Sequence, residues 1–367
     1  MFINVSDPQT QTLVVTIILS LVAILSIRHE QTPAFLTTQH GSELKGLAIL
    51  MVIFGHIGYL LSRDHSFLSP LSGSAGVGVD IFLILSGFGL AVSALKKELS
   101  PLEFYKKRFV KIFIPMWAVI ALLLILDHFV HGLNYSGTTI LQSFLGFFPD
   151  SNPFGALDSP LWYFTLITFY YLLFPLVFVK RLKYLSPIIF IVVGYLMLNL
   201  PLPIDTGIWT LYSLHYWGFS VGIIVALLLS RLPKNLTIPG VVRLAASLLG
   251  VLFIIYNYFS PHVGSSRELE QLYSIITALA YIVFISLKGF RVQLLKVLGD
   301  LSYEIYLVHW PILFRYDLIY TALPAGIATM VYLAIFTIIG WAIQRTVAAI
   351  PVEPPHGAAL QNLPHRR

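Results

Sequence analysis

The sequence predicts an all-α polytopic membrane protein with about eleven transmembrane helices. Of its 367 residues, 57% are hydrophobic and only 11% are charged. Charged residues make up about 25% of an ordinary globular domain, so this composition indicates an integral membrane protein. The apolar residues form runs long enough to cross about 30 Å of hydrocarbon. The basic residues gather in alternate loops between those runs.

Eleven apolar segments are the candidate helices, and ten of them form a core after an extra N-terminal one. The first is short, but no Lys or Arg precedes Arg28 and no small-residue cleavage site follows. We therefore interpret it as a retained helix rather than a signal peptide. In chain order the segments are residues 12–27, 44–61, 76–95, 109–131, 161–179, 185–200, 208–229, 241–259, 271–287, 297–316 and 322–343.

The loops between these segments test each one in turn. If the N-terminus is outside, all but three of the 23 Lys and Arg residues fall in cytoplasmic loops, and the three outer ones are Arg63, Arg267 and Arg315. This asymmetry follows the positive-inside rule, and a wrong number of segments would scramble it. The pattern predicts an outer N-terminus, a cytoplasmic C-terminus and a multi-pass protein of the cell (inner or plasma) membrane.

Three regions follow from this topology. Residues 1–39 hold the N-terminal helix and a cytoplasmic linker, residues 40–345 form the membrane domain, and residues 346–367 form a Pro-rich cytoplasmic tail. The basic residues behind the net charge of +6 are explained by their role in orienting the helices in the membrane, so we expect no nucleic-acid partner. The absence of cysteine excludes disulfides, cysteine thioesters and thiolate metal sites, and we expect no metal cofactor.

Ionisable residues inside a membrane are costly and are candidates for function. Lys45 and His56 are eleven residues apart, so they share one helix face about 16 Å apart, with Lys45 at the cytoplasmic mouth. Asp80 enters from outside in the next segment and reaches a depth similar to that of His56. Ser302, Tyr306 and His309 share a face of a later segment.

Trp162 and Tyr163 lie near the outer surface, so residues from four segments fall at comparable depth and predict a buried polar chamber. For each of these residues, a purely structural role stays open as the alternative to a role in function. His56 and Asp80 can serve as interhelical contacts, and His309, followed by Trp310 and Pro311, can mark a kink with an interfacial Trp.

A histidine oriented by a carboxylate can take a proton from a hydroxyl as that hydroxyl attacks an acyl carbon. We predict no nucleophilic Ser-His-Asp elbow, which favours direct transfer without an enzyme-bound intermediate. The acyl donor then needs an anionic handle at the basic cytoplasmic mouth and a long thin arm that reaches the chamber. Coenzyme A meets both requirements.

Five ordered motifs carry a family resemblance: "GLAILMVIFGH", "GVGVDIFLILSGF", "FYKKRFVKIFIP", "LWYFTLITFYYLLFPL" and "LGDLSYEIYLVHWPIL". In these motifs residues 40–343 resemble the acyltransferase 3 family of membrane O-acyltransferases. The resemblance implies transfer of an acyl group, usually acetyl, from cytoplasmic acyl-CoA to an envelope carbohydrate across the membrane. Acceptors in the family include O-antigen, exopolysaccharide, peptidoglycan and macrolide sugars.

The resemblance also assigns roles to single residues. His56 matches the essential histidine of the family, and Lys45 takes the basic position that precedes it with ten residues between, where arginine is more usual. Arg108 matches an arginine expected at the CoA end, and Lys111 replaces another. Asp80 matches the VD pair and Trp162 the LW motif, but the "SVEE" of one large subgroup is absent.

The resemblance implies the following mechanism. The CoA phosphates bind near Lys45, Arg108 and Lys111; His56, positioned by Asp80, is the general base or passes the acyl group to a relay. Tyr306 and His309 position the acceptor or stabilise the oxyanion.

We expect membrane lipid and an envelope polysaccharide or glycolipid as partners. Because no fused esterase-like domain follows residue 343, a separate extracytoplasmic protein is a further candidate partner. Two other functions stay open at this point: a secondary transporter of a small anion or sugar, and a non-catalytic assembly factor.

Overall fold

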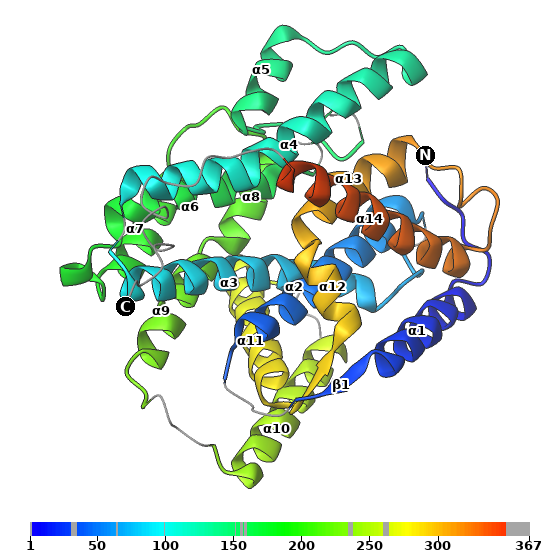
Figure 1. Cartoon of the computed structure of the whole chain (residues 1–367). Helices are drawn as coiled ribbons and strands as arrows, with labels where there is room; N and C mark the ends of the chain where they lie inside the picture. Colours follow the sequence, from blue (N-terminus) through cyan, green and yellow to red (C-terminus); the bar gives the residue numbers. More distant parts are fainter. Residues whose placement is uncertain are drawn as a thin grey trace, which may run out of the picture.

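The structure is a computed structural model that describes residues 2–30, 35–63, 65–98, 100–150, 152–154, 157, 160–233, 238–259 and 264–349. Most of the Pro-rich tail predicted at 346–367 lies outside the described residues. The helices, drawn in Figure 1, are α1 (Pro8–Leu25), α2 (Thr38–Gly55), α3 (Ala75–Lys96), α4 (Pro101–His131), α5 (Gly137–Leu145), α6 (Trp162–Val177), α7 (Ser186–Leu198), α8 (Thr206–His215), α9 (Gly218–Leu229), α10 (Gly240–Phe259), α11 (Arg267–Leu287), α12 (Gln293–Asp300), α13 (Ser302–Arg315) and α14 (Ala325–Ala348).

The prediction of an all-α polytopic membrane protein is confirmed. Within the described residues, eight helical stretches are long and apolar enough to cross a membrane, and α6 and α7 are shorter apolar helices. The one sheet is a pair of three-residue antiparallel strands, β1 (Ile27–His29) and β2 (Phe290–Val292). The number of spans and their orientation stay predictions.

Two of the predicted segments are broken in the structure. Segment 208–229 is divided into α8 and α9 at Tyr216 and Trp217, and segment 297–316 is divided into α12 and α13 at Leu301. An apolar run does not reveal a break of one or two residues, because hydropathy is unchanged there. α4 also begins eight residues before its predicted start, and α5 lies in an outer loop for which no helix was predicted.

Glycine residues let the central helices approach closely. A Cβ on Gly46 of α2 would lie 1.9 Å from the carbonyl oxygen of Leu295, and one on Gly299 of α12 would lie 1.7 Å from that of Ser42. Gly87 of α3 and Gly222 of α9 form a second such pair. Small residues at helix crossings are typical of membrane bundles.

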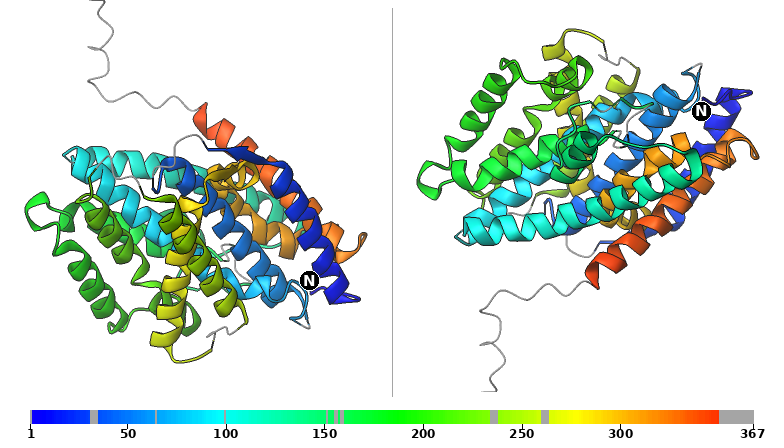
Figure 2. Two further views of the ribbon diagram at one scale, coloured as in Figure 1. Left: turned by 90° about the horizontal axis from the view of Figure 1, so that it is seen from below. Right: turned by 90° about the horizontal axis from the view of Figure 1, so that it is seen from above.

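The N-terminal helix packs on the outside of this bundle beside the last one, as Figure 2 shows for α1 and α14. The loop after α1 pairs through β1 with β2, and Lys288 donates a hydrogen bond of 2.5 Å to Glu43 close by. These contacts join segments that the predicted topology places on the cytoplasmic side. The contacts place these segments on one side of the bundle, and the orientation of that side stays a prediction.

Candidate active site

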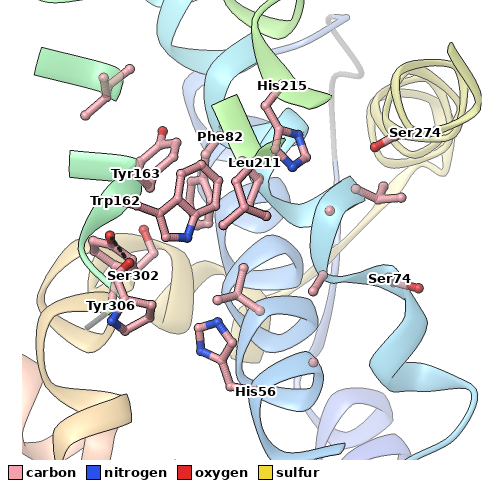
Figure 3. Close-up of a pocket in the computed structure, with 18 of the residues that line it drawn as sticks. His56, Ser74, Phe82, Trp162, Tyr163, Leu211, His215, Ser274, Ser302 and Tyr306 are labelled. Carbon is pink, nitrogen blue, oxygen red and sulfur yellow. Dashed lines mark hydrogen bonds between the residues drawn. The ribbon is translucent and has the colours of Figure 1, made fainter. Parts of the chain in front are cut away.

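A cavity of about 1270 Å³ runs between α2, α3, α4, α6, α8, α11 and α13. Six of the eight residues predicted for the site line it: Lys45, His56, Arg108, Lys111, Trp162 and Tyr306. The other two, Asp80 and His309, are fully buried behind its wall. Figure 3 shows the central part of the cavity, with Trp162 between His56 and His215 in that view.

His56 lies where the regular helix gives way to another form. α2 ends at Gly55, and His56–Leu61 continue as one π-helical turn. Such turns are rare and occur often at functional sites. The Nδ1 of His56 lies 2.8 Å from the Nε2 of His309, and the two rings are within 5° of parallel.

The hydrogen bonds of His309 fix the tautomers of both neutral rings. The Nδ1 of His309 lies 2.9 Å from the carbonyl oxygen of Tyr306 and 3.2 Å from that of Ile305. A carbonyl oxygen only accepts, so this nitrogen carries the proton and the Nε2 of His309 accepts. His56 then donates from Nδ1, and its Nε2 keeps a lone pair. The cavity-lining histidine is thus arranged as a base.

The roles expected for His309 and Tyr306 change accordingly. Both ring nitrogens of His309 are hydrogen-bonded inside the protein, so neither is available to an acceptor or an oxyanion. The hydroxyl of Tyr306 donates to the carbonyl oxygen of Pro160 at 2.9 Å, so its proton is already used. Tyr306 still lines the cavity with its ring.

The predicted pairing of His56 with Asp80 is wrong. One carboxylate oxygen of Asp80 lies 3.0 Å from the Nδ1 of His215, and the other accepts a hydrogen bond of 2.5 Å from Ser274. The close packing of Gly78 against α2 explains the difference, because a Cβ there would lie 2.7 Å from the carbonyl oxygen of Ala48. α3 therefore turns Gly78 toward α2, and Asp80, two residues on, projects about 200° away around the helix. Similar depth does not imply the same direction.

His215 and Ser274 were missed by the sequence analysis. His215 lies in the apolar segment 208–229, where an ionisable residue is itself a signal of function. The five family motifs do not include this segment, so the resemblance does not point to His215. Ser274 of α11 gave no such signal, because a single serine in an apolar helix is common.

One end of the cavity is basic. Lys45, Arg108 and Lys111 line it there, and the guanidinium of Arg108 lies over the ring of Tyr171 at 5.1 Å. Asp300 and Glu304 also line this end: Asp300 is paired with Lys296 at 2.6 Å and with the hydroxyl of Ser42 at 2.7 Å, and Glu304 lies near Lys111. The arrangement leaves cationic groups available to an anionic ligand.

The other end, on the predicted outer side, is lined by carboxylates. Asp150, Asp205 and Glu270 lie there, and the described part of the cavity wall has no Lys or Arg at that end. The cavity therefore changes from basic to acidic along its length, with His56 between the two ends.

Comparison with known proteins identifies the family. The acyltransferase domain of the acyltransferase 3 family matches residues 44–345, which is most of the chain. No curated protein and no solved structure matches. The confirmed membrane fold and this match agree with the resemblance of the five sequence motifs. The chain therefore belongs to the acyltransferase 3 family and is a membrane acyltransferase.

Proposed function

We propose that this protein transfers an acyl group, acetyl in the simplest case, from cytoplasmic acyl-CoA to a hydroxyl of a carbohydrate or glycolipid on the outer side of the membrane. The observation that carries the proposal is that one cavity holds a basic end and His56, whose Nε2 has no hydrogen-bond partner among the described residues. Family membership supports acyl transfer, and neither the comparisons nor the described residues favour the transporter alternative.

The basic end suits the donor. Coenzyme A carries its phosphates at one end and the thioester at the other, joined by a thin flexible arm. With the phosphates at Lys45, Arg108 and Lys111, the arm extends along α2 over the about 16 Å that separates Lys45 from His56. The thioester then lies beside His56, while the phosphates of CoA stay in the basic end of the cavity.

His56 moves the proton of the reaction. Its Nε2 removes the proton of the acceptor hydroxyl as the oxygen attacks the thioester carbonyl carbon. The carbon–sulfur bond breaks, the ester forms, and the imidazolium returns the proton to the sulfur of CoA. His309 accepts the hydrogen bond from Nδ1 throughout and keeps the ring in the required tautomer.

The decisive experiment compares envelope glycans and glycolipids of the producing organism by mass spectrometry. Four strains are compared: gene deleted, restored, restored as His56→Ala, and restored as His128→Ala. His128 is an exposed histidine of α4 and serves as the matched control. We expect a base-labile acyl increment that requires the gene and His56 but not His128. Full acylation with inserted His56→Ala protein would contradict the mechanism.

A further inference from the structure

A second imidazole, that of His215, lines the cavity outside the pair formed by His56 and His309. His215 is the last residue of α8, and only 5% of its surface is exposed. Its Nδ1 lies 3.0 Å from the carboxylate of Asp80, which is fully buried and also holds Ser274. An ionised carboxylate only accepts, so the neutral ring carries its proton on Nδ1 and keeps a lone pair on Nε2.

The lone pair of His215 is open to the cavity. Among the described residues, no protein group is hydrogen-bonded to the Nε2 of His215. Trp162 stacks on one face of the ring, with 5.8 Å between ring centroids and 23° between planes. Gly76 lies at the ring edge, where a Cβ would be 3.9 Å from Nε2, so the glycine leaves that edge uncovered.

Trp162 adds a donor to the same cavity wall, on the side of its ring that faces His56 in Figure 3. Its indole N–H has no hydrogen-bond partner among the residues that the structure describes, and the ring lines the same wall as His215. Figure 3 shows the two rings side by side, with His56 across the cavity. A hydroxyl both donates and accepts, so a donor and an acceptor on one cavity wall fit a molecule that carries several hydroxyls. The ring of Trp162 also offers an apolar surface to the C–H groups of such a molecule.

The charges near this wall favour an acceptor without negative charge. Asp150, Asp205 and Glu270 line the outer end of the cavity. Asp205 also caps α8 through the backbone N–H of Gly207 at 2.8 Å, and Glu270 accepts from the N–H of Gly264 at 3.0 Å. An anionic sugar would meet these three carboxylates on entry and would be repelled by them.

We propose that His215 and Trp162 form the acceptor subsite and bind an uncharged polyhydroxylated carbohydrate through a hydroxyl other than the one that reacts. His215 accepts a hydrogen bond at Nε2, Asp80 fixes the tautomer, and His56 acts on the reacting hydroxyl. This inference rests on the proposed function and names its acceptor class. It also gives Asp80 a role: it positions His215 rather than His56.

Two substitutions separate acceptor binding from a structural role. His215→Ala removes both ring nitrogens. His215→Asn keeps an N–H close to the position of Nδ1, where it donates to Asp80, but removes the nitrogen that faces the cavity. If His215 only supports Asp80, the Asn variant restores activity. If it binds the acceptor, both variants fail alike.

Each variant is expressed in the gene-deleted strain, and the base-labile acyl increment on uncharged glycans and glycolipids is measured by mass spectrometry. The same full-length proteins are purified, and the Kd of acetyl-CoA is measured by calorimetry. We expect both variants to lose the increment at least tenfold while the Kd for acetyl-CoA stays within twofold. The His128→Ala protein should match the wild type in both measurements.

Four results would overturn the inference. They are wild-type acylation by His215→Ala, recovery by His215→Asn alone, loss of acetyl-CoA binding in both variants, and an increment found only on anionic glycans. If the wild-type strain shows no gene-dependent increment in any fraction, the proposed function fails and the acceptor subsite fails with it. The first two results leave the proposed function intact, so the two failures are distinguishable.

Discussion

The Nδ1 of His56 lies 2.8 Å from the Nε2 of His309, and this contact determines which nitrogen of His56 faces the cavity as a base. His309 is fully buried and is itself held by two backbone carbonyl oxygens of its own helix. A chain of hydrogen bonds therefore runs from the backbone of α13 through His309 to the Nδ1 of His56. It leaves the lone pair of His56 on Nε2. A general base needs a fixed tautomer as well as a suitable position.

Replacing His309 should slow catalysis without weakening donor binding. In His309→Ala, the Nδ1–H of His56 loses its acceptor and the ring is free to adopt the other tautomer. We expect the rate of acetyl transfer in membranes to fall about 10²-fold. The Kd of acetyl-CoA should not change. His309→Gln, whose side-chain oxygen can accept from His56, should recover part of the rate.

A double variant tests whether the two histidines act as one unit. If His309 acts only through His56, the variant that lacks both should be no slower than His56→Ala alone, because effects within one unit are not additive. Multiplied losses in the double variant would show an independent role for His309.

The basic end of the cavity predicts a change in donor affinity. Lys45→Ala, Arg108→Ala and Lys111→Ala should each raise the KM for acetyl-CoA about tenfold, which is about 1.4 kcal/mol, with a smaller effect on kcat. Lys107→Ala is the matched control, because Lys107 is exposed on the same helix as Arg108 and does not line the cavity.

A truncated donor identifies which part of CoA these residues hold. Acetyl-pantetheine carries the thioester and the arm but no phosphates. If Lys45, Arg108 and Lys111 bind phosphate, their substitution should leave the KM for acetyl-pantetheine unchanged. An equal rise in KM for both donors would contradict phosphate binding at this end.

Much of the fold and part of the site follow from the sequence. The helices are predictable because a segment that crosses hydrocarbon must be apolar and must form its backbone hydrogen bonds within itself. The eleven-residue interval between Lys45 and His56 also correctly predicts that both line one cavity. The partner of Asp80 is not predictable in this way. It depends on which face of α3 meets α2, and Gly78 sets that face through a contact with Ala48 that no hydropathy pattern reveals. His215 likewise joins the site through a break between α8 and α9 that lies inside one apolar run.

The crossing of α2 and α12 predicts a sharp difference between two glycines of one helix. A Cβ on Gly46 would lie within 1.9 Å of the backbone of α12, whereas Gly41 has nothing within 4 Å of that position. Gly46→Ala should force the helices apart and lower the thermal midpoint of the purified protein by several degrees, because overpacking typically costs about 1–3 kcal/mol. Gly41→Ala should leave the midpoint unchanged or raise it, since alanine favours a helix. Equal midpoints for the two variants would show that this crossing is not close-packed.

The C-terminal ends of α4 and α13, on the predicted outer side, are joined by a buried ion pair. Asp127 is fully buried and is paired with Arg315, and it accepts hydrogen bonds from the hydroxyls of Tyr135 at 2.7 Å and Tyr316 at 2.5 Å. Arg315 also donates to the carbonyl oxygen of Leu157 at 2.7 Å, which fixes part of the outer loop. Removal of one partner from such a pair leaves an uncompensated charge, at a cost of about 3–5 kcal/mol. Arg315→Ala should therefore lower the thermal midpoint more than Arg267→Ala, because Arg267 is an exposed outer arginine.

The same cluster predicts the response to alkaline pH. Burial, together with the hydrogen bond to Asp127, raises the pKa of Tyr135 to about 12, against about 10 in an unfolded chain. Because the folded pKa is the higher one, this tyrosine contributes stability that is fully present below pH about 10 and is lost as the pH rises through about 12. Tyr135→Phe loses the hydrogen bond and should have a lower thermal midpoint at pH 8, but its midpoint should fall less between pH 9 and 12. Thermal unfolding followed by tryptophan fluorescence across that pH range measures both effects. Parallel pH profiles for the two proteins would show that Tyr135 does not titrate as part of this cluster.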